Sequence, residues 1–378
     1  MRNVLRVLFI SLVLSLVIPA VTFAQTPPPQ QKQEVSKAEV TKILNTGEIY
    51  VDKSKQNPYQ TVVVKILDGN DTGKDITIDN GKQSTIRSDQ LVNVGDKVVV
   101  SKISTPKGSD YQITDRYRLD WLLGIVIAFF ALVIGLCRLK GLGSIIGLGI
   151  SLFVIMAFLI PQIIAGQDPL MISIISAIAI MTTTMYLAHG FSRKTHIAVG
   201  ATTVSLLLTG FLAYFFVNIL QLNGLGSEDA NSLRFGPTES LNFKGLLLGG
   251  IIIGALGVLD DVTTSLATVV EELKKANPTF TFLQLSRSAF RVGSEHITSL
   301  VNTLVLAYAG AGLPLFLYLI INPGGQPLWS ILNSELIVEE LVRTLAGSIG
   351  LVLAVPITTI FAAWIHSQFI TTNEKRKK

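Results

Sequence analysis

The chain has 378 residues, of which 49% are hydrophobic and 15% are charged, and its formal net charge is +5. In a soluble protein this positive charge would favour an anionic partner such as nucleic acid, but here the basic residues cluster at the ends of long apolar runs. The single cysteine, Cys137, excludes an intrachain disulfide and a cysteine-rich metal site. The composition therefore indicates a polytopic membrane protein.

The N-terminus has the pattern of an export signal. Two arginines precede a short apolar run at residues 7–18, and a small-residue cleavage site follows at Ala24. We therefore predict a cleaved signal peptide over residues 1–24, with a retained short anchor helix as the alternative. In both cases we expect residues 25–118 to lie outside the cytoplasm.

Residues 25–118 are predicted to form a small all-β domain. A Pro- and Gln-rich linker at 26–31 is followed by short β-rich runs, which are separated by turn signals such as Asn80-Gly81. The runs are 39–44, 48–51, 61–67, 74–78, 97–103 and 111–114. Strands of this length and spacing favour a closed or half-closed barrel similar to the oligonucleotide/oligosaccharide-binding (OB) fold.

This β domain is not expected to bind nucleic acid. Its acidic and basic residues nearly balance, whereas a phosphate-binding face needs a surplus of positive charge and stacking aromatic residues. Its aromatic residues are Tyr50, Tyr59, Tyr111 and Tyr117. We expect a structural module, or a surface that contacts a protein partner outside the cytoplasm.

Residues 119–378 are dominated by seven apolar runs and are predicted to form the membrane domain. Each run has about 17 to 24 residues, enough at about 1.5 Å per residue to cross a hydrocarbon core of about 30 Å. Because backbone groups in lipid must be paired internally, these runs predict seven transmembrane α-helices in contact with the lipid bilayer. They are expected at 119–137, 142–160, 170–188, 197–220, 243–259, 300–321 and 345–365.

Lysines and arginines predict the orientation, because cytoplasmic connections carry an excess of them. With residues 25–118 outside, the external connections hold only Arg234, Lys244 and Arg343. The cytoplasmic connections and tail hold Arg138, Lys140, Arg193, Lys194, Lys274, Lys275, Arg287, Arg291, Lys375, Arg376, Lys377 and Lys378. We therefore expect the mature N-terminus outside and the C-terminus in the cytoplasm.

Two adjacent carboxylates, Asp260 and Asp261, follow the fifth run. Together with Thr264 they are the candidate proton- or ion-coupling residues, because an acid at mid-membrane costs about 2.5 to 3.5 kcal/mol unless it is protonated or paired. The alternative is that the span ends at Leu259 and the acids start a solvated cytoplasmic helix. Their candidate polar partners are Glu271, Arg291, Glu295, His296, Asn302 and Tyr308. His296 could relay protons, although a lone histidine is more often structural.

These motifs resemble the YibE/F family of bacterial membrane proteins. The resemblance rests on GALGVLDDVT at 254–263, EEL at 271–273, SAFRVG at 288–293, EHI at 295–297 and VNTLVLAYAG at 301–310. It implies a multi-pass protein of the bacterial cell (inner or plasma) membrane. The Asp-Asp pair followed by Glu-Glu-Leu is also similar to a segment of the export auxiliaries SecD and SecF. That similarity implies that Asp260 or Asp261 carries a proton, although no arginine or lysine is expected in the membrane core as a counter-ion.

Two functions are compatible with the sequence. One is an ion-coupled transporter or export-associated membrane machine that uses the helix of Asp260 and Asp261; the other is a non-transporting scaffold or regulator whose β domain binds a partner. An enzyme is not expected, because the chain has no His-Glu-x-x-His, Gly-x-Ser-x-Gly or Gly-x-Gly-Asp motif. Without a Gly-x-x-x-x-Gly-Lys loop or clustered ligand residues, no cofactor or metal is expected.

Overall fold

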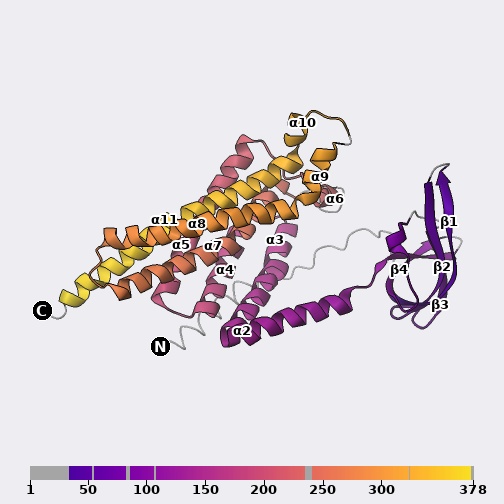
Figure 1. Cartoon of the computed structure of the whole chain (residues 1–378), viewed down its shortest axis with the longest axis horizontal. Coiled ribbons are helices and arrows are strands. Elements are labelled where there is room, and N and C mark those ends of the chain that lie inside the picture. The colour runs from indigo at the N-terminus through magenta and orange to yellow at the C-terminus, as the bar shows by residue number, and fades with distance from the viewer. Residues whose placement is uncertain are drawn as a thin grey trace. The chain divides into compact units, whose positions relative to one another are not determined.

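The computed structural model describes residues 34–52, 55–81, 86–105, 108–234, 241–322 and 324–375. The predicted signal peptide, the Pro- and Gln-rich linker and the end of the basic tail lie outside the described residues. The chain forms two compact units, one that contains the β sheet and extends to Leu136, and one that starts at Cys137. Figure 1 labels their helices and strands.

The first unit contains five antiparallel strands in the order β3-β2-β1-β4-β5. They are β1 (Glu34–Asp52), β2 (Lys55–Ile66), β3 (Asp75–Asn80), β4 (Lys97–Thr105) and β5 (Gly108–Arg116). Register shifts bend β1, and the edge strands β3 and β5 come close to each other. The sheet is a curled half-barrel, as predicted. The expected strands 39–44 and 48–51 are one strand, because the residues between them also pair with β2.

Alternating apolar residues of this sheet form its core, and one buried acid links the loop between β2 and β3 to strands β4 and β5. Asp71, between β2 and β3, accepts hydrogen bonds from Lys74 Nζ at 2.6 Å, Lys102 Nζ at 2.7 Å and the Tyr111 hydroxyl at 2.8 Å. The Lys102 ammonium, followed by Lys74 and Tyr111, holds the pKa of Asp71 well below its usual range. Asp71 in turn raises the pKa of Lys102.

Six described helical segments are long and apolar enough to cross a membrane. They are Leu119–Leu139, Gly141–Ile164, Pro169–His189 (α4), Arg193–Ile219 (α5), Phe243–Ala276 (α7) and Glu335–Ser367 within α11 (Glu335–Lys375). A seventh is formed if α8 (Phe282–Ala311) and α9 (Leu313–Ile321), which meet at a bend of 63°, count as one span. These six or seven long apolar helices agree with the predicted membrane domain.

Shorter elements complete the membrane domain. The first two spans share one helix, α2 (Leu119–Val154), which breaks at Arg138, where φ is 53°. A π-helical turn (Ile155–Leu159) and α3 (Ile160–Ile164) extend the second span. The connections that precede α7 and α11 contain the short helices α6 (Glu228–Arg234) and α10 (Leu328–Leu332).

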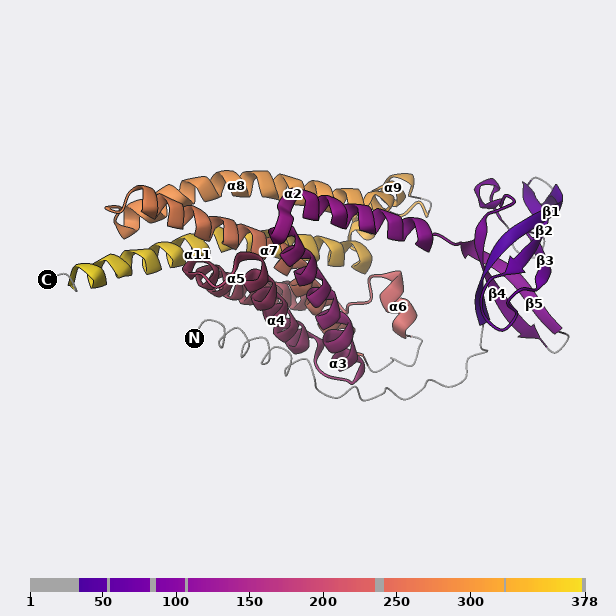
Figure 2. The same ribbon diagram turned by 90° about the horizontal axis from the view of Figure 1, so that it is seen from below.

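Helices α5, α7 and α11 pack against one another at the centre of the second unit. Helix α4 contacts α7, and α8 lies along α7 and α11 (Figure 2). Glycines allow two of these contacts to be close: a side chain at Gly249 of α7 would collide with Ser173 of α4, and one at Gly350 of α11 would collide with Thr209 of α5. This packing fixes the helix that carries the two aspartates.

Candidate functional site

The two aspartates lie in the middle of one continuous helix, α7. Its first turn is capped by the Asn242 side chain, which accepts a hydrogen bond from the Gly245 N–H at 2.9 Å. The helix passes through Leu259 without interruption and ends at Asn277, which precedes a proline. The predicted span and the predicted cytoplasmic helix are therefore two parts of the same 34-residue helix.

The cavity beside these aspartates has a volume of about 600 Å³ and lies between the second half of α2, α4 and α7. Asp260 is partly buried in its wall, whereas Asp261 is exposed. The side chains that line it include those of Ser144, Leu148, Thr184, Met185, His189, Asp260, Asp261, Thr264, Ser265 and Thr268. We refer to it as the Asp260 cavity.

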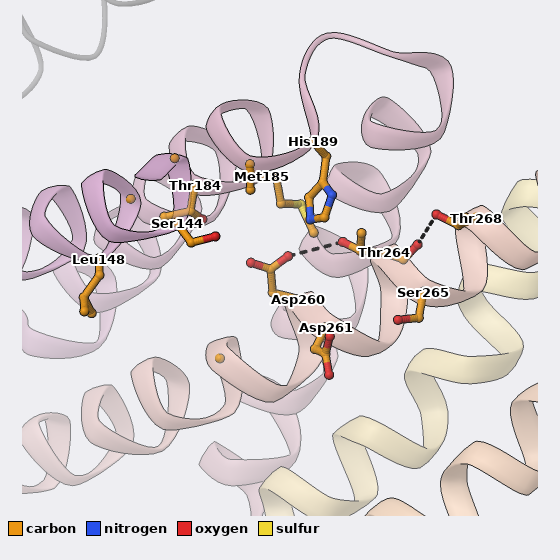
Figure 3. A pocket seen from close by; sticks show the side chains of 14 residues that line it. Ser144, Leu148, Thr184, Met185, His189, Asp260, Asp261, Thr264, Ser265 and Thr268 are labelled. Atoms are coloured by element: carbon orange, nitrogen blue, oxygen red, sulfur yellow. Dashed lines mark hydrogen bonds between the residues drawn. The ribbon is translucent and has the colours of Figure 1, made fainter. Parts of the chain in front are cut away.

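The Asp260 carboxylate points into this cavity (Figure 3). Its Oδ1 atom lies 3.4 Å from the Thr264 hydroxyl, which donates to it from the next turn of α7. Met185 and His189 of α4 face it from across the cavity, and Asp261 points in a different direction. A carboxylate, a hydroxyl and an imidazole from two helices thus share one space.

A buried contact between helices fixes the backbone of this turn. The hydroxyls of Thr202 in α5 and Thr263 in α7 are 2.5 Å apart, and both residues are fully buried. The Thr263 hydroxyl also lies 3.2 Å from the backbone carbonyl oxygen of Asp260. The carboxylate therefore extends from a backbone that is held against α5, while its side chain faces the cavity.

Glycines of two helices line the Asp260 cavity. At Gly143 and Gly147 of α2, an added Cβ atom would lie 3.4 Å from the Leu187 carbonyl oxygen and 3.5 Å from the Thr184 methyl group, which are ordinary van der Waals distances to α4. At Gly257 of α7, by contrast, an added Cβ would meet no heavy atom within 4 Å. Gly257 therefore leaves space open beside Asp260.

The chemistry of this lining suits a cation. Its polar groups are carboxylates, hydroxyls and the His189 imidazole, and no lysine or arginine is among the lining residues. Carboxylate and hydroxyl oxygens can ligate a small hydrated cation, and a carboxylate can also bind a proton. Within the described part of the chain, no group of three or more His, Cys, Asp or Glu side chains could hold a metal ion.

The predicted polar partners lie elsewhere. Glu271 pairs with Lys275 at 3.1 Å, one turn along α7. Glu295 and His296 line a second cavity of about 320 Å³ between α7 and α8. Arg291 and Asn302 are exposed on α8, and Tyr308 is half-buried on the same helix. None of these six residues lines the Asp260 cavity.

Sequence reasoning did not place His189, Ser144 or Thr184 at the site, because no pattern in the sequence shows which helices face α7. It also missed a buried acid near the start of α11. Glu339 is 5% exposed and accepts a hydrogen bond from the Gly226 N–H at 3.0 Å.

The helix of this buried acid begins earlier than predicted. Arg343, which we had assigned to an external connection, lies about two turns inside α11, within a candidate span, and pairs with Glu340 at 3.4 Å. The expectation that the membrane core holds no arginine or lysine as a counter-ion stays a prediction, and Arg343 is the residue on which it depends. The three acids at the start of α11 made this segment resemble a loop.

The sequence model of the family described as YibE/F-like protein matches residues 125–368, which include every residue of the Asp260 cavity. The chain belongs to the YibE/F-like family. It is a multi-pass membrane protein whose helices contact the lipid bilayer, and the resemblance found in the sequence motifs is confirmed. No curated protein and no solved structure matches the chain. The β sheet precedes the matched range, so the family assignment rests on the membrane domain.

Proposed function

We propose that this YibE/F-like protein is an ion-coupled transporter or an export-associated membrane machine, and that it binds a proton or a small monovalent cation in the Asp260 cavity. The observation that carries the proposal is the cavity itself. It places a partly buried carboxylate among hydroxyl groups, within a candidate span and without a lysine or arginine in its lining. Acidic groups inside membrane bundles commonly mark ion pathways.

Energetic considerations support coupling through this cavity. An ionised aspartate at mid-membrane costs about 2.5 to 3.5 kcal/mol, so a bound cation or proton would stabilise the helix bundle. One elementary charge that moves through a potential of 100 mV supplies about 2.3 kcal/mol. The two quantities are similar, so one cation per cycle could drive a modest conformational step between two states.

The function proposed for this protein is transport and not catalysis of a chemical reaction. In the proposed setting, the protein lies in the bacterial plasma membrane with its β domain outside and its C-terminus in the cytoplasm. The predicted export signal and the excess of lysine and arginine in the predicted cytoplasmic connections support this orientation. The β domain would then contact a protein partner outside the cytoplasm.

The test is an ion-flux measurement on purified protein in vesicles, with a pH-sensitive dye inside for a proton gradient and a sodium-sensitive dye inside for a sodium gradient across the membrane. We expect Asp260→Asn to abolish the signal, because the amide is nearly isosteric but cannot bind a proton or carry the charge that holds a cation. Glu272→Gln, at an exposed acid on the same helix, is the control and should leave the signal intact.

A second variant tests the cavity without changing a charge. Gly257→Val fills the open space beside Asp260 and should also stop the flux, while the protein remains inserted and folded. If the wild-type protein produces no ion-dependent signal under either gradient, the transport proposal is wrong. The scaffold or regulator function would then be favoured.

A further inference from the structure

The second cavity adjoins the Asp260 cavity through a single residue. Ser265, Leu266 and Val269 of α7 line one side of it, and Val292, Glu295, His296 and Ser299 of α8 line the other. Ser265 also lines the Asp260 cavity, one helical turn after Asp261. The Ser265 side chain is therefore the shared wall between an acidic cavity and a mainly apolar cavity that contains a histidine.

The histidine in this second cavity has an unpaired nitrogen. The Nε2 atom of His296 is buried and has no hydrogen-bond partner. Leaving such a polar group unpaired is unfavourable, and in a native protein it calls for an explanation. In the neutral tautomer with its hydrogen on Nδ1, Nε2 is a proton acceptor.

Close packing holds this imidazole against α7. Gly293 lies one turn before His296 on α8, and a Cβ atom there would lie 2.6 Å from Val355 Cγ1 and 3.1 Å from Leu266 Cδ2. The backbone of α8 can approach α7 and α11 this closely only because residue 293 is glycine. His296 is consequently fixed at the α7 surface.

Few charged groups surround this imidazole. Glu295 of α8 is the other titratable residue that lines the second cavity. Helix α7 contributes no titratable group to this lining, and its acids on either side of the lining residues are Asp260 and Asp261 before Ser265 and Glu271 and Glu272 after Val269. Helix α11 packs against α7 and α8 here through Leu351 and Val355, which are both apolar. The aspartates across Ser265 are thus the acids that could exchange a proton with His296 from the membrane interior.

We propose that His296 is a second proton carrier of the same pathway, which exchanges protons with the Asp260 cavity past Ser265. This inference rests on the proposed function and adds the route of the proton. The proton leaves a protonated Asp260 or Asp261, which becomes a carboxylate, and is accepted by His296 Nε2, which becomes an imidazolium. The Ser265 side chain lines both cavities, and its hydroxyl can both donate and accept a hydrogen bond. Return of the proton to the carboxylate, or its release past Glu295, restores the neutral ring.

The experiment compares two histidines in the full-length protein, reconstituted in vesicles of phosphatidylethanolamine and phosphatidylglycerol. His366 is the matched control, because its Nε2 atom is also buried and unpaired but it lines neither cavity. The proton flux is measured between pH 5 and 8, where a histidine changes its charge. We expect His296→Gln to lower the flux by about tenfold or more and to flatten its dependence on pH. His366→Gln should match the wild type.

Ser265→Ala is a second variant, which keeps the test valid if His296→Gln fails to fold. It removes the hydroxyl that lines both cavities and leaves the imidazole in place. It should lower the flux and retain the wild-type unfolding temperature. If His296→Gln and Ser265→Ala both match His366→Gln while Asp260→Asn is inactive, His296 is no carrier and the proposed function stands. If the wild-type protein carries sodium but shows no proton flux, this inference is overturned and the proposed function stands. If it shows no flux under a proton or a sodium gradient, both are overturned.

Discussion

The contact of α8 with the central helices predicts opposite effects for the same substitution at two sites. Gly293 and Gly310 both lie in α8, where alanine has the higher helix propensity by about 0.5 to 1 kcal/mol. At Gly293 the new methyl group would lie 2.6 Å from Val355 Cγ1 and 3.1 Å from Leu266 Cδ2, both in a buried cluster. At Gly310 it would meet no heavy atom within 4 Å.

Whether Gly293→Ala raises or lowers the stability of the protein depends on whether Val355 and Leu266 can move away from the new methyl group. Val355 is β-branched and lies inside a helix, where one side-chain rotamer dominates, so it cannot readily turn away. Overpacking of this kind costs about 1 to 3 kcal/mol. The cost exceeds the gain in helix propensity, so we expect Gly293→Ala to destabilise the protein and Gly310→Ala to be neutral or slightly stabilising.

The assay is thermal unfolding of the purified protein in detergent, followed by circular dichroism. A difference in unfolding free energy of about 1 to 3 kcal/mol between the two variants corresponds to a gap of about 2 to 12 °C between their midpoints. If Gly293→Ala unfolds at the same temperature as Gly310→Ala, or above it, α8 does not dock on α7 and α11 through residue 293. The second cavity would then lose its structural basis.

Two further predictions concern the β domain and the topology. Asp71 has a lowered pKa and Lys102 a raised one, so their pair stabilises the fold fully between about pH 5 and 9; its contribution declines as pH falls below about 4 or rises above about 10. Urea unfolding of a fragment of residues 34–116 should therefore show Asp71→Asn as less stable than wild type at pH 7, with a difference that narrows as pH falls from about 4 to about 2.5, and equal stability at pH 7 would contradict this. A reporter active only outside the cytoplasm should work after Tyr111 and fail after Lys378, whereas activity at the C-terminus would refute the orientation.

The membrane fold could be predicted because few backbone structures can cross a bilayer with all their polar groups hydrogen-bonded. Apolar runs long enough to span a bilayer must be helical, and this constraint located the six candidate spans of the described residues and the bent pair of α8 and α9. Helix boundaries were less predictable where a helix carries acids. The prediction ended the fifth span at Leu259 and started the seventh at residue 345, whereas α7 continues to Ala276 and α11 begins at Glu335. Hydropathy reports the lipid-facing part of a helix, and hydrogen bonding continues beyond it.

The candidate site was predictable only along one helix. Helical spacing placed Thr264 one turn after Asp260, and the structure shows these two side chains in contact. The opposite wall could not be predicted, because His189 and Thr184 come from α4, and only tertiary packing decides which face of α4 meets α7. The same limit applies to His296, whose position beside Ser265 depends on the close contact at Gly293.

The two faces of α7 differ beside the aspartates, and this difference decides which part of the site can respond to a cation. On one face, Leu259, Val262 and Leu266 are buried in cores formed with neighbouring helices. On another face, Asp260 and Thr264 line a cavity. Side chains that face a cavity can change rotamer without displacing packed neighbours, whereas buried side chains cannot. Neutralisation of the Asp260 carboxylate by a cation would therefore act first on the residues that line the cavity, while the buried face supports the backbone of α7.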